Sequence, residues 1–208
     1  LLDRCSQTLE QSICYVMDPE GLTIASSNRQ APDSFVGKSY AFRPYFQQAM
    51  QNCPGRYWAL GVTSKEMGYY ASCPVRDPAG KILGVAVVKR IIDEPKKVFP
   101  GRSPALIIDP HGIVVMANQK KLVLRSLWPL PYQIRKKLLD SKQFGEGPFT
   151  SILDHKPRDG GECLFQSKRL RVLMQPGFWQ KWSIVRLEPM KPIVQARLLG
   201  ISIPIVLS

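Results

Sequence analysis

The chain has 208 residues, 44% of them hydrophobic and 22% charged, which is enough for one large globular domain or two small ones. Its net charge of +13 is uneven, because residues 1–95 hold 10 Lys and Arg against 9 Asp and Glu, whereas residues 96–208 hold 19 against 7. The excess is scattered and accompanies no nucleic-acid-binding signature, so we interpret it as a solvated basic surface near a membrane and expect no nucleic-acid partner.

The first half of the chain predicts the end of a helix followed by a five-stranded unit. Residues 1–11 are amphipathic and look like the end of a longer helix. Strand-like residues flank the turn DPEG (18–21), which predicts a β-hairpin because Pro fixes φ, Asp accepts backbone hydrogen bonds and Gly closes the turn. The predicted elements that follow are a helix at 43–51 and strands at 56–62, 68–75 and 82–89, with a second such turn, DPAG, at 77–80.

The second half repeats this plan. A third turn, DPHG (109–112), lies between strand-like residues and predicts another hairpin. The elements predicted after it are a helix at 131–141 and strands at 147–153, 162–167 with 170–175, and 182–187. The sequence therefore predicts an α+β chain, in which an N-terminal helix precedes two tandem domains, each with a central antiparallel sheet of about five strands and flanking helices.

We expect the domain boundary in the stretch DEPKKVFPGRSP (93–104), which is rich in proline and charge. This divides the chain into a helix end at 1–13 and domains at 14–95 and 96–190. Residues 196–208 become almost purely apolar after Arg197 and are too few to span a bilayer. They indicate the start of a transmembrane helix or a buried C-terminal strand.

The cysteines give no sign of a disulfide framework or a metal site. They are odd in number, and no C-x-x-C pair occurs. We expect most of them to be small buried hydrophobic residues, and a Cys53–Cys73 bridge stays open in an oxidising compartment. The five are Cys5, Cys14, Cys53, Cys73 and Cys163.

An arginine among aromatic residues is the first candidate binding group. In SYAFRPYFQQA (39–49), four aromatic residues surround Arg43 and a proline follows it directly. A guanidinium that is partly buried there needs an anionic partner. The alternative is a solvated arginine that stacks on a tyrosine.

Strand alternation brings a lysine and several hydroxyl groups toward the same region. Tyr70 and Ser72 share one face of their strand, and the face of the next strand that carries Val85 and Val87 ends in Lys89. The stretch GVTS adds two more hydroxyls at a strand end, those of Thr63 and Ser64. Lys89 could equally be an ordinary lysine at the end of a strand, and the two hydroxyls could belong to a turn.

Such a lining suits a small organic anion. Arginine offers a fork to one carboxylate and lysine a point charge to another, while hydroxyls complete the shell and aromatic residues exclude water. We see no carboxylate in the lining, which disfavours an amino acid, whose ammonium group needs one. Two cations predict a ligand with two anionic groups.

Catalysis finds no support in the residues. His111 and His155 lie in loops without a nucleophilic partner, and Asp154 with Asp159 is an isolated acid pair. Neither a P-loop nor a dinucleotide fingerprint occurs. We therefore expect no catalytic residues, no metal and no cofactor.

The ordered run of motifs from DPEGLTIASSN through SYAFRPYFQQAM and GRYWALGVTSKEMGYYASCPV to GKILGVAVVK resembles a known sensor family. The resemblance is to the extracytoplasmic double Cache, or tandem PAS-like, sensor of bacterial histidine kinases of the Dct type, which sense four-carbon dicarboxylates. It covers residues 14–95 closely and continues more loosely through IIDPHGIVVMAN and LRSLWPL.

The resemblance implies a periplasmic sensor in a membrane-anchored receptor that dimerises through its N-terminal helices. The ligand, similar to succinate, malate or fumarate, would lie in the membrane-distal first domain, and the whole protein would be a histidine kinase. The ligand contacts implied by motif are Arg43, Tyr40, Thr63, Ser64, Ser72 and Lys89, beside which the residues themselves suggest Tyr70.

Three other functions stay open at this point. The same sensor could belong to a chemoreceptor or a cyclic-dinucleotide enzyme that recognises another carboxylate. A purely structural ectodomain would satisfy Arg43 and Lys89 internally. The basic second half could instead bind anionic lipid.

Overall fold

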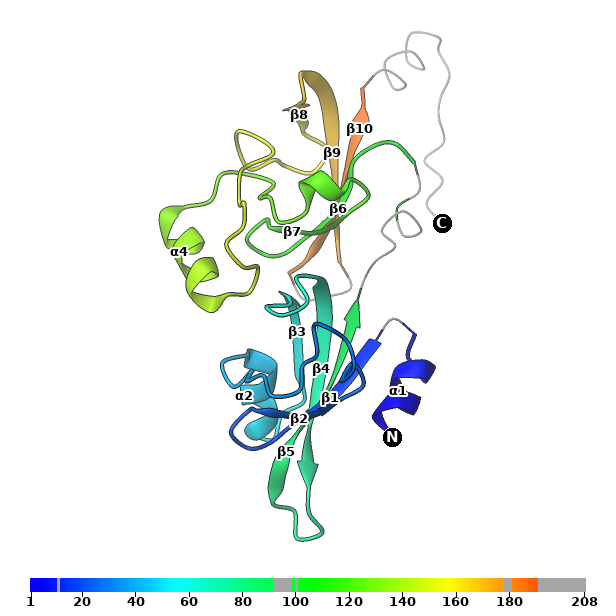
Figure 1. Ribbon diagram of the computed structural model, residues 1–208. Helices are drawn as coiled ribbons and strands as arrows, with labels where there is room; N and C mark the ends of the chain where they lie inside the picture. The colour runs from blue at the N-terminus through cyan, green and yellow to red at the C-terminus, as the bar shows by residue number, and fades with distance from the viewer. Residues whose placement is uncertain (11, 92–98, 100, 178–180, 191–208) are drawn as a thin grey trace. The chain divides into compact units, whose positions relative to one another are not determined.

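The computed structural model divides the chain into two compact units, each described here by itself (Figure 1). The first comprises Leu1–Asp93 and Lys142–Gly145, and the second Glu94–Ser141 and Glu146–Ser208. The structure describes residues 1–10, 12–91, 99, 101–177 and 181–190.

Two predictions fall on parts of the chain outside these described residues. They are the apolar segment at 196–208 and most of the boundary stretch at 93–104. Within the described ranges, no helix has the length and apolar character needed to cross a membrane.

The first unit is an antiparallel sheet with helices packed against it. Helix α1 contacts β1, whereas α2 lies against β3, β4 and β5. The strands follow the order β2-β1-β5-β4-β3, so that β5 is central. The elements are α1 (Leu2–Thr8), β1 (Ser12–Met17), β2 (Thr23–Ser26), α2 (Pro44–Met50), β3 (Gly55–Leu60), β4 (Met67–Arg76) and β5 (Ile82–Ile91).

The second unit has a sheet of the same order, β7-β6-β10-β9-β8. The prediction of an α+β chain with two antiparallel five-stranded sheets is thus confirmed. Its elements are β6 (Ala105–Ile108), β7 (Val114–Ala117), the 3-10 helix η1 (Lys120–Leu122), α4 (Tyr132–Ser141), β8 (Glu162–Phe165), β9 (Lys168–Pro176) and β10 (Ser183–Pro189).

The strand predicted at 147–153 is wrong. The φ of Phe149 is 48°, outside the extended region. Backbone hydrogen bonds join the segment to residues 124–127, but its pairing there is limited to an isolated bridge between Ser151 and Ser126, and it joins neither sheet. The fifth strand arises because residues 162–175, predicted as one strand candidate, form two paired strands. Gln166 and Ser167 have φ values of 51° and 63°, the two positive angles of a type I′ hairpin turn, so this stretch forms both β8 and β9.

The three Asp-Pro-x-Gly hairpins are confirmed, and all have the same construction. In each turn the glycine N–H donates to the carbonyl of the aspartate, at 2.9–3.0 Å. The glycines Gly21, Gly80 and Gly112 have φ values of 83°, 88° and 87°, and each hairpin has a register shift beside its turn. This combination is typical of a type I turn followed by a glycine bulge.

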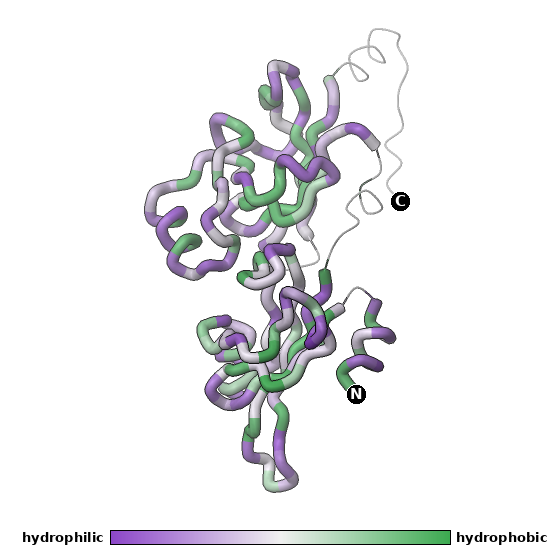
Figure 2. Tube along the Cα trace, viewed as in Figure 1, coloured by the Kyte–Doolittle hydropathy of each residue, from purple (hydrophilic) through white to green (hydrophobic). Residues whose placement is uncertain are grey.

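Each unit has its own apolar core, and hydrophobic residues lie along the strands of both sheets (Figure 2). The core of the first unit is unusually aromatic. Edge-to-face contacts join Tyr15, Phe35 and Tyr40 at centroid distances of 5.3–6.0 Å, and Tyr45 stacks on Tyr70 at 5.0 Å. The loop that precedes α2 is therefore held on the sheet by aromatic packing.

We predict that Gly21→Ala destabilises the protein more than Gly80→Ala. Both glycines need the left-handed region, which costs an alanine about 1 kcal/mol. A Cβ on Gly21 would also lie 2.7 Å from Ala41, whereas nothing lies within 4 Å of one on Gly80. Urea denaturation of both variants measures the difference, and equal losses would contradict the close packing of Gly21 against the Tyr40 loop.

Candidate functional site

The register of the first sheet places the predicted binding residues in one row. Lys89 on central β5 lies opposite Tyr70 on β4, which lies opposite Tyr57 on β3. Side chains at paired positions share a face of the sheet, and this is the face that α2 covers. The strand pairing thus places an ammonium group and two phenol groups side by side.

Two glycines leave room for the Lys89 side chain to extend across the sheet. A Cβ on Gly68 would lie 2.8 Å from the Lys89 Cε, and one on Gly61 would lie 3.2 Å from its Nζ. Because neither residue has a side chain, the lysine runs across β4 and reaches the loop after β3. There its Nζ donates to Ser64 Oγ at 2.5 Å.

Arg43 contacts the end of β3, directly before the same loop. It lies directly before α2, and its guanidinium donates to the carbonyls of Leu60 at 2.9 Å and of Lys142 at 3.2 Å. The ring of Phe42 lies 4.9 Å from its Cζ. Since Leu60 is followed by Gly61, where Lys89 ends, the two cations converge on neighbouring residues.

Several hydroxyl groups lie near the two cations. The hydroxyls of Tyr40 and Thr63 are 2.7 Å apart, and that of Tyr70 would lie 3.2 Å from a Cβ on Gly61. Burial raises the pKa of Tyr40, Tyr57 and Tyr70, while the positive charge of Arg43 opposes this rise in each. The phenols are therefore protonated at neutral pH and available as hydrogen-bond donors.

Both cations are removed from water. Arg43 is 2% exposed and Lys89 is 0% exposed, and no buried carboxylate accompanies them among the described residues of the first unit. Burial lowers the pKa of Lys89 from the ordinary lysine value of 10.5, and the negative charges of Glu66 and Asp33 oppose this lowering. Two buried positive charges without a buried anion are costly, which is typical of a site that awaits an anionic ligand.

The expectation that no carboxylate lines the site is wrong. Glu66 Oε2 lies 3.9 Å from Lys89 Nζ, although its side chain is 52% exposed. Sequence reasoning overlooked Glu66 because it follows a turn in which a charged residue is ordinarily solvated. It is the loop closure between β3 and β4 that turns this side chain toward Lys89.

Ser72 differs from the other candidates. Its hydroxyl is buried and donates to the carbonyl of Tyr45 at 2.7 Å, and it lies one row away from Lys89, opposite Val87. Gly55 opposite it on β3 leaves room for this contact, since a Cβ there would lie 2.4 Å from Ser72 Oγ. The hydroxyl proton of Ser72 thus joins β4 to α2, and a ligand contact from this residue stays a prediction.

Sequence reasoning also missed two groups that contact Arg43. The positive charge of Arg43 opposes the rise in the pKa of Tyr57, so the two side chains are neighbours, and alternation along β3 could have identified this tyrosine as facing Tyr70. The carbonyl of Lys142 belongs to a segment about a hundred residues away in sequence. No pattern in the sequence indicates that backbone partner.

The expectation that most cysteines are buried is only partly met. Cys14 and Cys163 are buried and Cys5 is intermediate, but Cys53 and Cys73 are exposed, and all five are free thiols in this structure. Across the described ranges, no cluster of His, Cys, Asp and Glu is suited to a metal ion.

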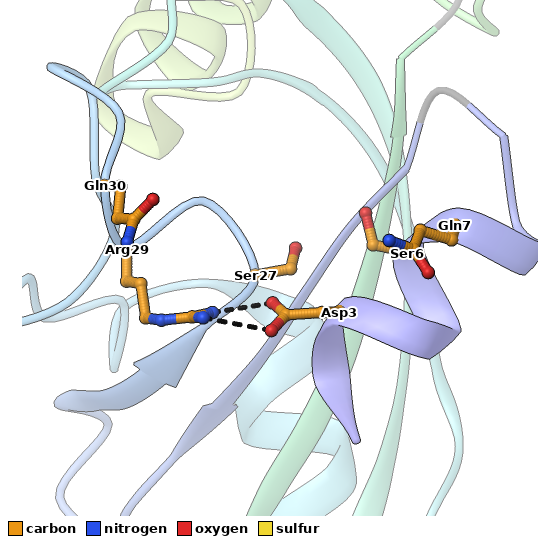
Figure 3. A pocket seen from close by; sticks show the side chains of 6 residues that line it. All are labelled: Asp3, Ser6, Gln7, Ser27, Arg29 and Gln30. Atoms are coloured by element: carbon orange, nitrogen blue, oxygen red, sulfur yellow. Dashed lines mark hydrogen bonds and ion pairs between the residues drawn. The ribbon is translucent and has the colours of Figure 1, made fainter.

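A pocket of about 280 Å³ lies elsewhere in the first unit, between α1 and the loop after β2 (Figure 3). Arg29 donates to both oxygens of Asp3 there, at 2.6 and 3.0 Å, and both side chains are about half exposed. The Arg29 guanidinium is thus already paired with a carboxylate, which leaves it less available to an acid. Its lining residues are Asp3, Ser6, Gln7, Ser27, Arg29 and Gln30.

We predict that Lys89→Met leaves the ligand-free protein as stable as the wild type or more stable by about 1 kcal/mol at neutral pH. Methionine fills a similar volume without the cost of burying a charge. Val87→Ala on the same face of β5 serves as the control, since deleting buried methyl groups costs about 2 kcal/mol. Chemical denaturation measures both, and a large loss in Lys89→Met would indicate that the lysine is a structural residue.

Comparisons with known proteins give two curated relatives. The C4-dicarboxylate transport sensor protein DctB of Rhizobium meliloti is 32% identical over 203 residues, which cover 91% of this chain and 32% of that protein. The protein of the same name from Pseudomonas aeruginosa is 36% identical over 120 residues, 57% of this chain and 19% of that protein. The chain therefore spans about a third or less of the length of these relatives, and no family model matches it.

Among solved structures, the sensor domain of the V. cholerae histidine kinase DctB has the same fold. The TM-score is 0.83 at 28% sequence identity, and the match covers 90% of this chain and 76% of that one. The likeness thus extends over both units.

Proposed function

We propose that this chain is an extracytoplasmic ligand-sensing domain like that of the DctB sensor proteins to which it is similar, and that its first unit binds a four-carbon dicarboxylate. The observation that carries the proposal is the pair of buried cations, Arg43 and Lys89, which meet at Leu60 and Gly61 without a buried carboxylate. The domain limits, 14–95 for the binding domain and 96–190 for the second, are part of the same proposal.

In the proposed complex, one ligand carboxylate accepts from the Arg43 guanidinium and the other from the Lys89 ammonium group. The guanidinium now donates to two backbone carbonyls, neutral acceptors that a carboxylate can replace with stronger charge-assisted hydrogen bonds. The hydroxyls of Tyr40, Thr63 and Ser64, already paired beside these cations, complete the shells. Tyr70 forms the wall between them.

We further propose that the whole protein is a membrane-anchored sensor histidine kinase that pairs through its N-terminal helices. In the described part of the chain, α1 buries none of its residues, which leaves its surface available to a second copy. Arg29 and Asp3 hold this helix to the loop after β2, so that the helix can respond to changes in the binding unit. A ligand shifts the signal only if it binds one of two states of the sensor more tightly than the other.

Ligand-induced stabilisation tests the binding proposal. Succinate at a hundred times its dissociation constant should raise the free energy of unfolding by about 2.7 kcal/mol, and Arg43→Lys should lose most of this gain because a lysine cannot provide the fork. Arg56→Lys is the control, an exposed arginine on β3. Thermal denaturation with succinate, malate, fumarate, acetate, pyruvate and amino acids measures the effect.

The outcomes distinguish the ligand class and separate a ligand-binding sensor from a structural ectodomain. A shift with monocarboxylates or amino acids alone would contradict the dicarboxylate proposal but retain a sensor. An absence of any shift, in protein verified to be free of bound acid, would favour the structural ectodomain.

The pH dependence should show opposite trends for affinity and stability. Because burial lowers the pKa of Lys89, its ammonium group loses its proton below pH 10.5, and succinate affinity should fall as the pH rises through that pKa. The ligand-free protein should gain stability over the same window, since the native state there binds fewer protons than the unfolded state. Calorimetry and denaturation between pH 7 and pH 10.5 measure both, and Lys89→Met should abolish the rise in stability.

A further inference from the structure

We propose that Glu66 is a displaceable internal counter-ion of Lys89, which competes with the ligand carboxylate and so sets the affinity and selectivity of the site. The inference rests on the proposed function, because it concerns the same lysine. It assigns a role to a residue that lies beside the binding groups without being one of them.

The loop between β3 and β4 fixes the position of Glu66. It comprises residues 61–66, and the Gly61 N–H donates to the Glu66 carbonyl at 2.9 Å, which closes the loop at its base. Ser64, in the same loop, accepts from Lys89 Nζ. The loop thus supplies both a hydroxyl and a carboxylate to one ammonium group.

The contact between the two charges is attractive but weak. At 3.9 Å, the distance between Glu66 Oε2 and Lys89 Nζ exceeds the 2.7–2.9 Å or so of a charge-assisted hydrogen bond. The exposures of the two side chains are also unequal, 52% for Glu66 and 0% for Lys89. The glutamate can therefore turn into solvent at little cost, whereas the lysine keeps its need for an anion.

A ligand carboxylate at Lys89 would lie close to the Glu66 carboxylate. The two negative charges would repel, and the ligand would bind only after Glu66 had moved away or at a cost in affinity. A ligand with an ammonium group beside its carboxylate would instead gain an attraction to Glu66. The glutamate should therefore weaken the binding of succinate relative to that of aspartate.

The experiment compares Glu66→Gln with wild type by calorimetric titration of the 208-residue chain with succinate and with aspartate. Glutamine keeps the size of the side chain and removes its charge. Glu20→Gln is the matched control, an exposed glutamate in the β1–β2 turn of the same unit. Glu66→Ala is a second variant that removes the charge without adding an amide.

We expect the dissociation constant for succinate to fall about three- to tenfold in Glu66→Gln, and in the same direction in Glu66→Ala. The ratio of succinate to aspartate affinity should rise in both, and Glu20→Gln should change neither value by more than about twofold. The thermal midpoint of ligand-free Glu66→Gln should fall slightly, because buried Lys89 loses its counter-ion.

Succinate binding by Glu66→Gln that is unchanged or weaker, with wild-type binding still dependent on Arg43, would overturn this inference and leave the proposed function intact. An absence of succinate binding in wild type and in both Glu66 variants would overturn both.

Discussion

The burial of two positive charges in one small apolar unit is the constraint on which the rest of this structure depends. Arg43 and Lys89 are among the largest fully buried side chains, yet their partners are backbone carbonyls, hydroxyls and one half-exposed glutamate. A domain selected only for stability would replace such groups with apolar ones. Their retention is the physical sign of a binding site in which stability is given up for function.

Glycines and aromatic packing around Arg43 and Lys89 make this burial possible. Glycines at 61 and 68 leave room for the Lys89 side chain. The Tyr40 N–H donates to the Gly21 carbonyl at 2.9 Å, which holds the loop that carries Tyr40 in place. The aromatic core then fixes the loop and α2 on the sheet, so that the guanidinium and the ammonium group are held before a ligand arrives. Such preorganisation reduces the entropy lost on binding.

The described residues of the second unit show the same sheet order without buried cations. Central strand β10 buries Val185 and Leu187, as β5 buries Val85 and Val87, but the next position on that face is Pro189 where β5 has Lys89. In the described residues of this unit, the only buried charged side chain is Asp109, which accepts backbone N–H groups within its own turn. The repeated fold thus carries the candidate site in its first copy.

Local patterns predicted most of the fold. The Asp-Pro-x-Gly turns and strand alternation specify the three hairpins and the faces of Tyr70 and Lys89, since both depend on neighbouring residues alone. The failures have a common cause, because the segment at 147–153 and the carbonyl of Lys142 depend on contacts that are distant in sequence. Glu66 was missed for a similar reason, as its approach to Lys89 depends on how the loop closes.

The central claim is that two buried cations require a ligand with two carboxylates, and paired calorimetric titrations with succinate and butyrate test it most directly. The two acids have the same number of carbon atoms but differ by one carboxylate. If each cation binds a carboxylate, succinate should bind at least about tenfold more tightly, which is the factor expected for one additional charged hydrogen bond. Equal affinities, or tighter binding of butyrate, would contradict the account.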